Sequence, residues 1–558
     1  MPRRLLLPAL LVLAICPYFI DLDGSSIWDA NEAFYVETPR EMMERGDYVY
    51  PTFNYEPRIN KPVLSYWIVA AFYHAFGVSP GVQRIPIAIG GIVLIAVAFF
   101  LARAAAPVGF QRDAGWWAAL GLAVSPRLVM FARRIFIDIY ISMFMALTLL
   151  FFALAERYPH RRRTFLTAMY VSVGLGILTK GPIAALLPGL VFGIYLLWHR
   201  ELGRIKEMML PVGTVIVLAI VVPWYAVLYI RAGWEPIASF LFGENVARYV
   251  EGLGVNADHR GLFWYVPVVF TDSFPLSLML LPAAAMWLRQ RRSGIMDPPS
   301  RVRTLLWLWI LTVVGFFSLS AGKQDLYVFP IVPAIAALGG VVIARALASD
   351  GTAELWPFVR GIAIAAGLII VAIGGGFFTL FYSRYAIYLL AGSAVVGLAA
   401  MIGGAIAAGL AFRRRLAEAL VVLVGTLIVV NWLFVLRVLP SFEAYKPAPG
   451  LARALEEHAG PNDVIVTYNV ALPSLVYYLQ RHIEVFYDHG PVLDLLKSRR
   501  PLYLMVTADD YERAIQPNVV EPLCRVSSQP TFDMKLKNVL SRRRLPEIWL
   551  MTNKCNSR

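Results

Sequence analysis

Residues 81–104 read GVQRIPIAIGGIVLIAVAFFLARA, and no charged side chain falls between Ile85 and Ala102. A helix needs about 20 apolar residues to cross a bilayer, so this stretch predicts a transmembrane helix. Runs of this kind recur along the 558-residue chain, which is 58% hydrophobic and only 16% charged. Soluble domains are about 25% charged. The sequence therefore predicts a polytopic α-helical membrane protein and argues against a soluble one.

The apolar runs predict about thirteen transmembrane helices. The first run follows Arg3 and Arg4 and lacks a small-residue cleavage site, so we interpret it as an uncleaved span and not as a signal peptide. The expected spans are residues 5–20, 81–104, 114–131, 138–156, 164–179, 182–198, 209–230, 265–288, 304–320, 326–346, 357–381, 386–411 and 416–436.

The net charge of +14 is carried mainly by short loops between these spans, such as Arg157–Arg163, Arg289–Arg303 and Arg413–Arg415. Cytoplasmic loops of membrane proteins collect Lys and Arg in this way. The pattern puts the N-terminus inside and, with an odd number of spans, the C-terminal tail outside. The basic charge therefore sets the topology, and we expect no nucleic-acid partner.

The segment Pro62–Gly77 is apolar enough to suggest a further span. If it crossed the membrane, every later Arg cluster would face outward, against the charge pattern. Its aromatic side chains and His74 suit a membrane interface. We therefore expect a helix that lies on the outer surface without crossing.

Two domains are expected. Residues 1–439 form the membrane domain, with outer loops at 21–80 and 231–264, and residues 440–558 form a small outer α/β domain. A proline-containing stretch at 439–449 is the expected linker. Of the three cysteines, Cys524 and Cys555 lie in the tail and could pair in an oxidising compartment.

Basic residues that break the charge pattern point to a site on the outer side. Singly, each could cap a helix or face water. Together they predict a cationic site for a phosphate or pyrophosphate at the outer interface. These residues are Lys61, Lys180, Arg248, Arg260 and Lys323.

Three acidic residues are candidates for catalysis on the same side. Asp29 and Glu32 lie one helical turn apart and could face one site, although a helix cap would explain them equally. Asp138 enters an apolar span, where a carboxylate is costly, unless it only pairs with Arg134. A divalent metal at Asp29, Glu32, Asp138 or His259 is left open, although the spacing matches no metal motif.

Several motifs resemble those of the lipid A 4-amino-4-deoxy-L-arabinose transferase (ArnT) family, which is related to the protein O-mannosyltransferases. The first is Trp28-Asp29-Ala30-Asn31-Glu32-Ala33-Phe34-Tyr35-Val36-Glu37, and the second is Lys61-Pro62-Val63-Leu64-Ser65-Tyr66-Trp67. Further matches are Leu178–Pro182, Phe242–Asn245 with Arg248, and Phe316–Ser320 with Lys323 and Tyr327.

The resemblance implies a GT-C glycosyltransferase fold with a C-terminal periplasmic domain in a bacterial inner membrane. It implies an undecaprenyl-phosphate sugar donor and lipid A as the acceptor. Lys61, Arg248 and Tyr327 match residues near the lipid phosphate, and Asp138 matches an acidic residue of the second outer loop. A protein or polysaccharide glycosyltransferase and a non-enzymatic transporter of lipid-linked sugar remain alternatives.

One departure from the family pattern concerns Asn31, where the family has an aspartate. An amide cannot act as a base. Asp29 could substitute for it. Alternatively, the acceptor is a phosphate, which is already anionic near neutral pH and needs mainly positioning.

Overall fold

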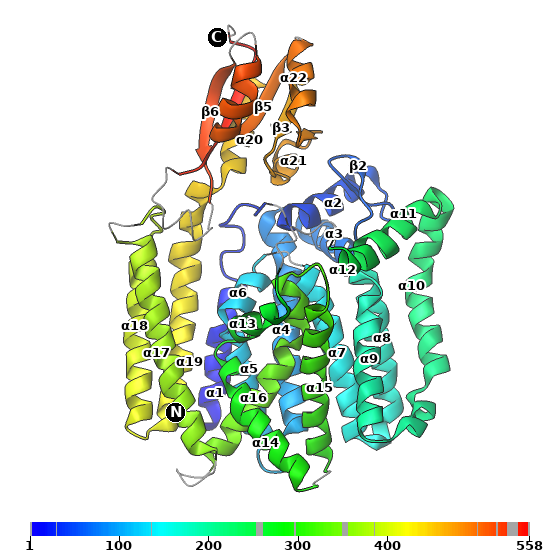
Figure 1. Ribbon diagram of the computed structural model, residues 1–558, viewed down its shortest axis with the longest axis vertical. Coiled ribbons are helices and arrows are strands. Elements are labelled where there is room, and N and C mark those ends of the chain that lie inside the picture. Colours follow the sequence, from blue (N-terminus) through cyan, green and yellow to red (C-terminus); the bar gives the residue numbers. More distant parts are fainter. Residues whose placement is uncertain are drawn as a thin grey trace.

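A computed structural model describes residues 3–29, 31–134, 137–252, 260–294, 297–348, 355–383, 386–498, 500–519, 523–532 and 545–555. It is a bundle of long helices with a small sheet domain above one end (Figure 1). The N-terminus lies low beside the bundle, and the C-terminus lies at the far tip of the sheet domain.

Eight helical segments among the described residues are long and apolar enough to cross a membrane. The long apolar runs explain them, because a continuous helix satisfies its own backbone hydrogen bonds in lipid. They are α4 (Pro80–Ala105), α7 (Ile137–Arg157), α10 (Leu210–Ala232), α15 (Pro298–Ser318), η7 with α16 (Asp325–Leu347), α17 (Trp356–Phe381), α18 (Ser393–Phe412) and α19 with its continuation (Leu416–Tyr445).

Two of the expected straight spans are bent. Residues 114–131 become α5 (Gln111–Ala123) and α6 (Pro126–Ala132), which meet at 65°. Residues 265–288 become Leu262–Asp272 and Leu276–Arg292, which meet at 112°. Both breaks fall at a proline, Pro126 or Pro275, where the ring removes a backbone donor and disfavours helix at the preceding residue.

Three further helical segments would complete the expected set of thirteen. They are α1 with the 3-10 turn η1 that continues it (Arg3–Tyr18), α8 (Arg162–Lys180) and α9 (Ile183–Trp198). By length and composition alone the described residues give eight spans, or up to ten if each bent pair counts as one. The number thirteen therefore stays a prediction, whereas the multi-pass membrane class is confirmed.

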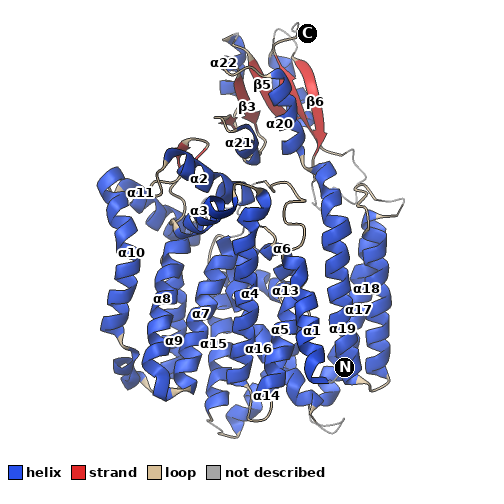
Figure 2. Cartoon of the chain, turned by 180° about the vertical axis from the view of Figure 1, so that it is seen from behind, coloured by secondary structure: helices blue, strands red, loops and turns tan. Residues whose placement is uncertain are grey.

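A layer of short elements covers the end of the bundle that faces the sheet domain (Figure 2). It contains α2 (Asn31–Arg45), the hairpin β1 (Thr52–Phe53) and β2 (Glu56–Pro57), and α3 (Leu64–Phe76). At 13 residues, α3 is about 20 Å long, too short for a hydrocarbon core of about 30 Å. This length agrees with the expected surface helix.

The second part of this layer follows α10. It consists of α11 (Glu235–Ala238), a π-helical stretch η4 (Ser239–Ala247) and α12 (Arg248–Val250). The π-helix is rare and is found frequently at functional sites. Figure 1 shows α11 and α12 running inward from the top of α10 toward α3.

The C-terminal tail forms the expected small α/β domain. Its sheet has the strand order β4-β3-β5-β7-β6, in which β3 pairs in parallel with β4 and β5, and β7 pairs antiparallel with β5 and β6. Its elements are α20 (Pro447–His458), β3 (Val464–Tyr468), α21 (Ser474–Leu479), β4 (Glu484–Phe486), α22 (His489–Lys497), β5 (Leu502–Thr507), β6 (Cys524–Pro530) and β7 (Glu547–Thr552).

The expected linker region is mostly helical. The helix of α19 continues through π- and 3-10 turns to Tyr445, and α20 begins at Pro447. Proline fits the first turn of a helix because its missing N–H would be unpaired there anyway. The membrane bundle is therefore joined to the sheet domain by nearly continuous helix.

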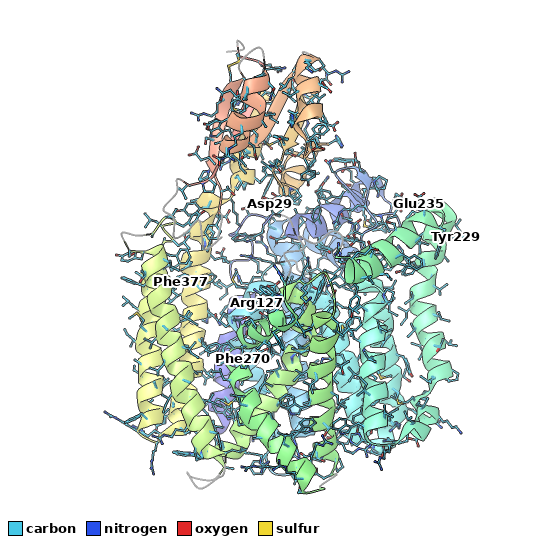
Figure 3. The ribbon with its side chains drawn as sticks, in the orientation of Figure 1. Asp29, Arg127, Tyr229, Glu235, Phe270 and Phe377 are labelled. Atoms are coloured by element: carbon cyan, nitrogen blue, oxygen red, sulfur yellow. A yellow bond between two sulfur atoms is a disulfide. The ribbon has the colours of Figure 1, made fainter. Side chains whose placement is uncertain are left out.

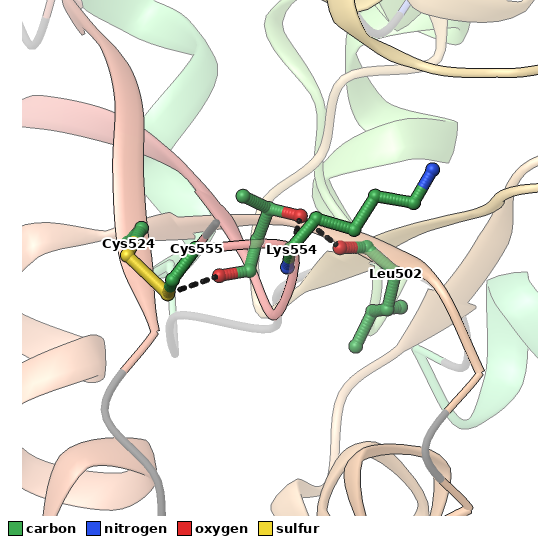
Figure 4. Close-up of a disulfide and its surroundings, with 5 residues drawn as sticks. Leu502, Cys524, Lys554 and Cys555 are labelled. Carbon is green, nitrogen blue, oxygen red and sulfur yellow. Dashed lines mark hydrogen bonds between the residues drawn. A yellow bond between two sulfur atoms is a disulfide. The ribbon is translucent and has the colours of Figure 1, made fainter. Parts of the chain in front are cut away.

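A disulfide joins Cys524 and Cys555, as the sequence suggested (Figure 4). Cys524 begins β6, and Cys555 follows the end of β7, so the bond ties the final residues to the edge strand. Beside it, the Thr552 hydroxyl donates to the Leu502 carbonyl oxygen at 2.9 Å. The disulfide thus closes the tail onto its own sheet.

Candidate functional site

A cavity of about 680 Å³ opens between the bundle and the layer of short elements. Its walls come from segments far apart in the sequence: α7, the end of α8, α9, α15 with η7, the loop before α3, and η4. Four basic and two acidic side chains line it, namely Arg58, Lys61, Lys180, Arg248, Asp138 and Glu244.

Lys61 lies in the loop between β2 and α3, with its side chain 13% exposed. Its ammonium donates to the Asn60 carbonyl oxygen at 2.8 Å and to Glu244 Oε2 at 3.1 Å. Burial lowers the pKa of Lys61 to about 8, because desolvation disfavours the charged form. The nearby cations lower it further, and the Glu244 carboxylate raises it.

Arg248 reaches the same carboxylate from the end of the π-helix. Its Nη2 lies 2.9 Å from Glu244 Oε2, the oxygen that also accepts from Lys61. Four residues separate Glu244 and Arg248, so one turn of the helix holds them together. Arg248 Nε is buried and has no hydrogen-bond partner within the described part of the chain.

Lys180 and Asp138 form a second ion pair in the cavity. Lys180 ends α8 because Gly181, at φ +101°, adopts a conformation that other residues avoid. Asp138 stands at the start of α7 and is 8% exposed. The Tyr327 ring lies 5.5 Å from the Lys180 ammonium. Asp138 therefore pairs across helices with Lys180, and Arg134 stacks instead on the Trp28 ring at 3.7 Å.

Sequence reasoning missed Arg58, which also lines the cavity. Its guanidinium stacks on the Phe34 ring at 3.9 Å. Its Nη1 is buried without a hydrogen-bond partner among the residues that the structure describes. The charge pattern could have identified it, because Arg58 is a further cation in the expected outer loop, three residues before Lys61.

The lining carries a net formal charge of +2, from four cations and two carboxylates. Two of these buried guanidinium donors lack a hydrogen-bond partner within the described ranges, and such donors are costly unless an acceptor arrives. Much of the remaining wall is apolar, with Ile141, Met145, Leu186, Leu187 and Leu241. The cavity is thus suited to an anionic head group attached to an apolar chain.

Two of the predicted cations do not line the cavity. Arg260 Nη1 donates to the Lys323 carbonyl oxygen at 2.8 Å, and the Lys323 ammonium donates to the Ser320 carbonyl oxygen at 2.6 Å. Ser320 itself belongs to the wall. Arg260 and Lys323 therefore bond to the backbone next to the wall, whereas we expected both to face the phosphate.

Glu32 does not line the cavity either. Its carboxylate accepts from Arg84 Nε at 2.7 Å and from the Trp28 backbone N–H at 2.8 Å, and its side chain is 1% exposed. A buried guanidinium needs a carboxylate partner, and Glu32 serves Arg84 in this way. The expectation that Glu32 and Asp29 share one site with the cations is not met by this geometry.

Asp29 instead contacts the C-terminal domain, and Figure 3 labels it between that domain and the helix bundle. Its Oδ1 accepts from the Ser474 backbone N–H at 2.8 Å, which caps α21 from another segment. Burial raises the pKa of Asp29 to about 6, while the Ser474 hydrogen bond opposes the rise. Asp29 thus bonds to the first turn of α21, whereas the cap alternative from the sequence placed it at the start of its own helix.

Other contacts fasten the first loop to the same domain. The Ile27 N–H donates to the Tyr478 hydroxyl at 2.9 Å, and the Asn54 amide exchanges two hydrogen bonds with the Ile483 backbone at 2.8 and 2.9 Å. The first outer loop thus contacts the C-terminal domain through Asp29, Ile27 and Asn54.

Two predicted positions lie outside this description. His259 is not among the described residues, and neither is the side chain of Asn31. Of the other metal candidates, Asp29, Glu32 and Asp138 contact different partners. In the described ranges, no group of three His, Cys, Asp or Glu side chains could hold a metal ion.

Comparisons with known proteins identify the class to which this fold and cavity correspond. Residues 60–226 match the family model of the dolichyl-phosphate-mannose-protein mannosyltransferases. The whole chain superimposes on ArnT from Cupriavidus metallidurans bound to undecaprenyl phosphate, with a TM-score of 0.77 and 22% identity over 98% of both chains. An archaeal oligosaccharyltransferase from Archaeoglobus fulgidus superimposes with a TM-score of 0.51 over 91% of this chain and 70% of its own. The chain therefore has the GT-C fold.

The relatives found by sequence comparison are named for one specific reaction. Two undecaprenyl phosphate-α-4-amino-4-deoxy-L-arabinose arabinosyl transferases of Pseudomonas fluorescens are 27% and 30% identical over 350 and 357 residues. Each match covers 62% of this chain and 58% of the relative, which is less than two thirds of the relative's length. The expected resemblance to ArnT and the protein mannosyltransferases is confirmed.

Proposed function

We propose that this chain is an integral membrane glycosyltransferase that transfers a sugar from an undecaprenyl-phosphate donor to an envelope acceptor. The observation that carries the proposal is the cavity, with its net charge of +2 beside an apolar wall. A polyprenyl-phosphate sugar has the matching chemistry: a charged phosphate between a sugar and a long apolar chain. The names of the Pseudomonas relatives agree with this donor.

The chemistry of the leaving group explains the cations. When the glycosidic C–O bond breaks, the electron pair stays on the phosphate oxygen, and the phosphodiester becomes a monoester with nearly one more negative charge. Lys61, Arg248 and Arg58 would stabilise that added charge in a site with little water, where preorganised donors are most effective. The spare donors of the two arginines would bind phosphate oxygens.

Asp138 is the acid that we propose for the acceptor side, because it lies in the cavity whereas Asp29 and Glu32 do not line it. Lys180 holds its carboxylate at the wall. A phosphate on lipid A is already anionic, so its oxygen needs positioning rather than deprotonation to attack the anomeric carbon. Asn31 in place of the family aspartate favours this acceptor.

A protein acceptor is the second candidate, favoured by the family model that spans residues 60–226. A serine or threonine hydroxyl would need a base to take its proton as the new bond forms. Of the two cavity carboxylates, Asp138 is the better candidate for this base. It pairs with one cation, Lys180, whereas Glu244 pairs with both Lys61 and Arg248.

We also propose an orientation: a bacterial inner membrane, with the cavity and sheet domain facing the periplasm. The disulfide supports this placement, because such bonds persist in oxidising compartments.

Purified protein in detergent with a radiolabelled undecaprenyl-phosphate sugar tests the proposal. Release or transfer of the label is expected, and lipid A and a serine-containing peptide are offered as separate acceptors. Mass spectrometry of lipid A from a deletion strain gives the acceptor in the cell. Binding of the donor without any cleavage would instead indicate a transporter or a binding protein.

A further inference from the structure

Glu244 occupies an unexpected place in a cavity built for an anion. Its Oε2 accepts from Lys61 at 3.1 Å and lies 2.9 Å from Arg248 Nη2, so one oxygen takes a donor from each of two phosphate-binding candidates. Its side chain is only 23% exposed. A carboxylate oxygen between a lysine and an arginine makes the contacts that a phosphate oxygen would make.

We propose that Glu244 is an internal counter-ion that occupies the phosphate position in the free site and competes with the lipid phosphate for Lys61 and Arg248. This inference rests on the proposed function and adds a role in the exchange of ligands. It differs from a fixed structural ion pair, because Lys61 and Arg248 would exchange the Glu244 carboxylate for the phosphate when the lipid binds.

The physical reason for such a residue lies in the product. The donor is a phosphodiester with one negative charge, whereas the polyprenyl phosphate left after transfer carries about −1.5 to −2 near neutral pH. A cavity that stabilises the second charge therefore tends to retain its product. A resident carboxylate weakens this retention, since it can reclaim Lys61 and Arg248 as the product leaves.

The local structure supports movement of Glu244 more than movement of Lys61. Glu244 lies in the π-helix η4, and Lys61 is held additionally by the Asn60 carbonyl oxygen at 2.8 Å. Among the described residues, the recorded charged partners of the Glu244 carboxylate are Lys61 and Arg248. When phosphate takes both, no ion pair from the described part of the chain still holds the carboxylate in place.

The test compares Glu244→Gln with wild type in the full-length protein. The amide keeps the shape and removes the competing charge, so undecaprenyl phosphate should bind on the order of tenfold more tightly, the equivalent of 1.4 kcal/mol. Product release should slow, which gives a burst of donor cleavage followed by a lower steady rate. Tryptophan-fluorescence titration with undecaprenyl phosphate and rapid-quench kinetics measure the two effects.

Glu251→Gln is the matched control. It makes the same change in charge at an exposed position, seven residues further along and outside the cavity lining. There it should leave binding and turnover unchanged. Thermal unfolding of each variant establishes that it is folded. If Glu244→Gln is not folded, Glu244→Asp replaces it, because the shorter carboxylate reaches its partners less well and should also tighten binding.

The outcomes separate this inference from the proposed function. If Lys61→Ala loses undecaprenyl phosphate binding while folded Glu244→Gln binds no more tightly than wild type, the donor site stands and the counter-ion role is wrong. Equal tightening in Glu251→Gln would also overturn the counter-ion role, since the effect would then be a general one of charge. If neither Lys61→Ala nor Glu244→Gln changes binding, the proposed function itself fails.

Discussion

The ammonium of Lys61 gives the sharpest test of the proposed donor site. It lines the cavity with its side chain only 13% exposed, so water can hardly replace its contact with the phosphate after a substitution. Losing one charge-assisted contact to the transition state in such a site costs about 2–4 kcal/mol, which is about 30- to 1000-fold in rate. Lys61→Ala should therefore reduce donor cleavage by that factor.

The pH dependence gives an independent measure of the same group. Burial lowers the pKa of Lys61 from 10.5 to about 8, so the free enzyme carries the charge below pH 8 and loses it above. Binding of a phosphate requires the charged form. Donor use should therefore be highest below pH 8 and fall by about tenfold per pH unit above it. Lys61→Arg should remove this decline, since a guanidinium stays protonated throughout, even if its different shape lowers the overall rate.

The assay is single-turnover cleavage of an undecaprenyl-phosphate sugar between pH 6 and 10 in detergent. Lys206→Ala serves as the control, because Lys206 is exposed on η3 (Leu202–Met208), outside the cavity lining. It should leave cleavage unchanged. Lys61 does not bind the donor phosphate if folded Lys61→Ala cleaves donor within threefold of wild type. Its ammonium does not set the pH dependence if Lys61→Arg keeps the same decline above pH 8.

Three further predictions concern the acids and the disulfide. Asp138→Asn should leave donor binding intact but lower transfer to a hydroxyl acceptor by about 10²- to 10⁴-fold. Transfer to a phosphate acceptor should fall much less. Product analysis with both acceptors measures the two transfer rates. Asp29→Asn should retain activity, because an amide oxygen can still accept from Ser474, whereas Asp29→Ala should loosen the sheet domain by about 1 kcal/mol in thermal unfolding. Full loss of transfer in folded Asp29→Asn would restore Asp29 as the base. Replacing Cys524 and Cys555 by serine should cost the sheet domain about 3–4 kcal/mol relative to oxidised wild type in denaturant unfolding, and reduced wild type should lose the same amount. Equal stabilities of the serine variant and oxidised wild type would contradict this prediction.

Much of the fold could be predicted because the strongest signals are local. An apolar run as long as residues 81–104 predicts a membrane-spanning helix by itself, and it forms α4. The two bent pairs were missed although each break falls at a proline, Pro126 or Pro275. A proline in an apolar run is compatible with a kinked helix or a broken one, and neighbouring helices decide between them.

The cations of the site were easier to predict than its acids. Lys61, Lys180 and Arg248 stand out because Lys and Arg are scarce on the outer side of the membrane. A basic residue in an expected outer loop therefore suggests a specific role. Acidic residues carry no such rule. Asp29 and Glu32 have the spacing of a shared site, but their partners are Ser474 and Arg84, which no local pattern connects to them.

The partners that remove these two acids from the cavity also determine its charge. With four cations against Asp138 and Glu244, the lining has a net charge of +2. If Asp29 and Glu32 had joined them, the net charge would have been zero, and a phosphate would have gained little by leaving water. Arg84 and the capped end of α21 therefore do more than stabilise the first loop. By holding two carboxylates elsewhere, they leave the cavity with the excess of cations that the proposed leaving group requires.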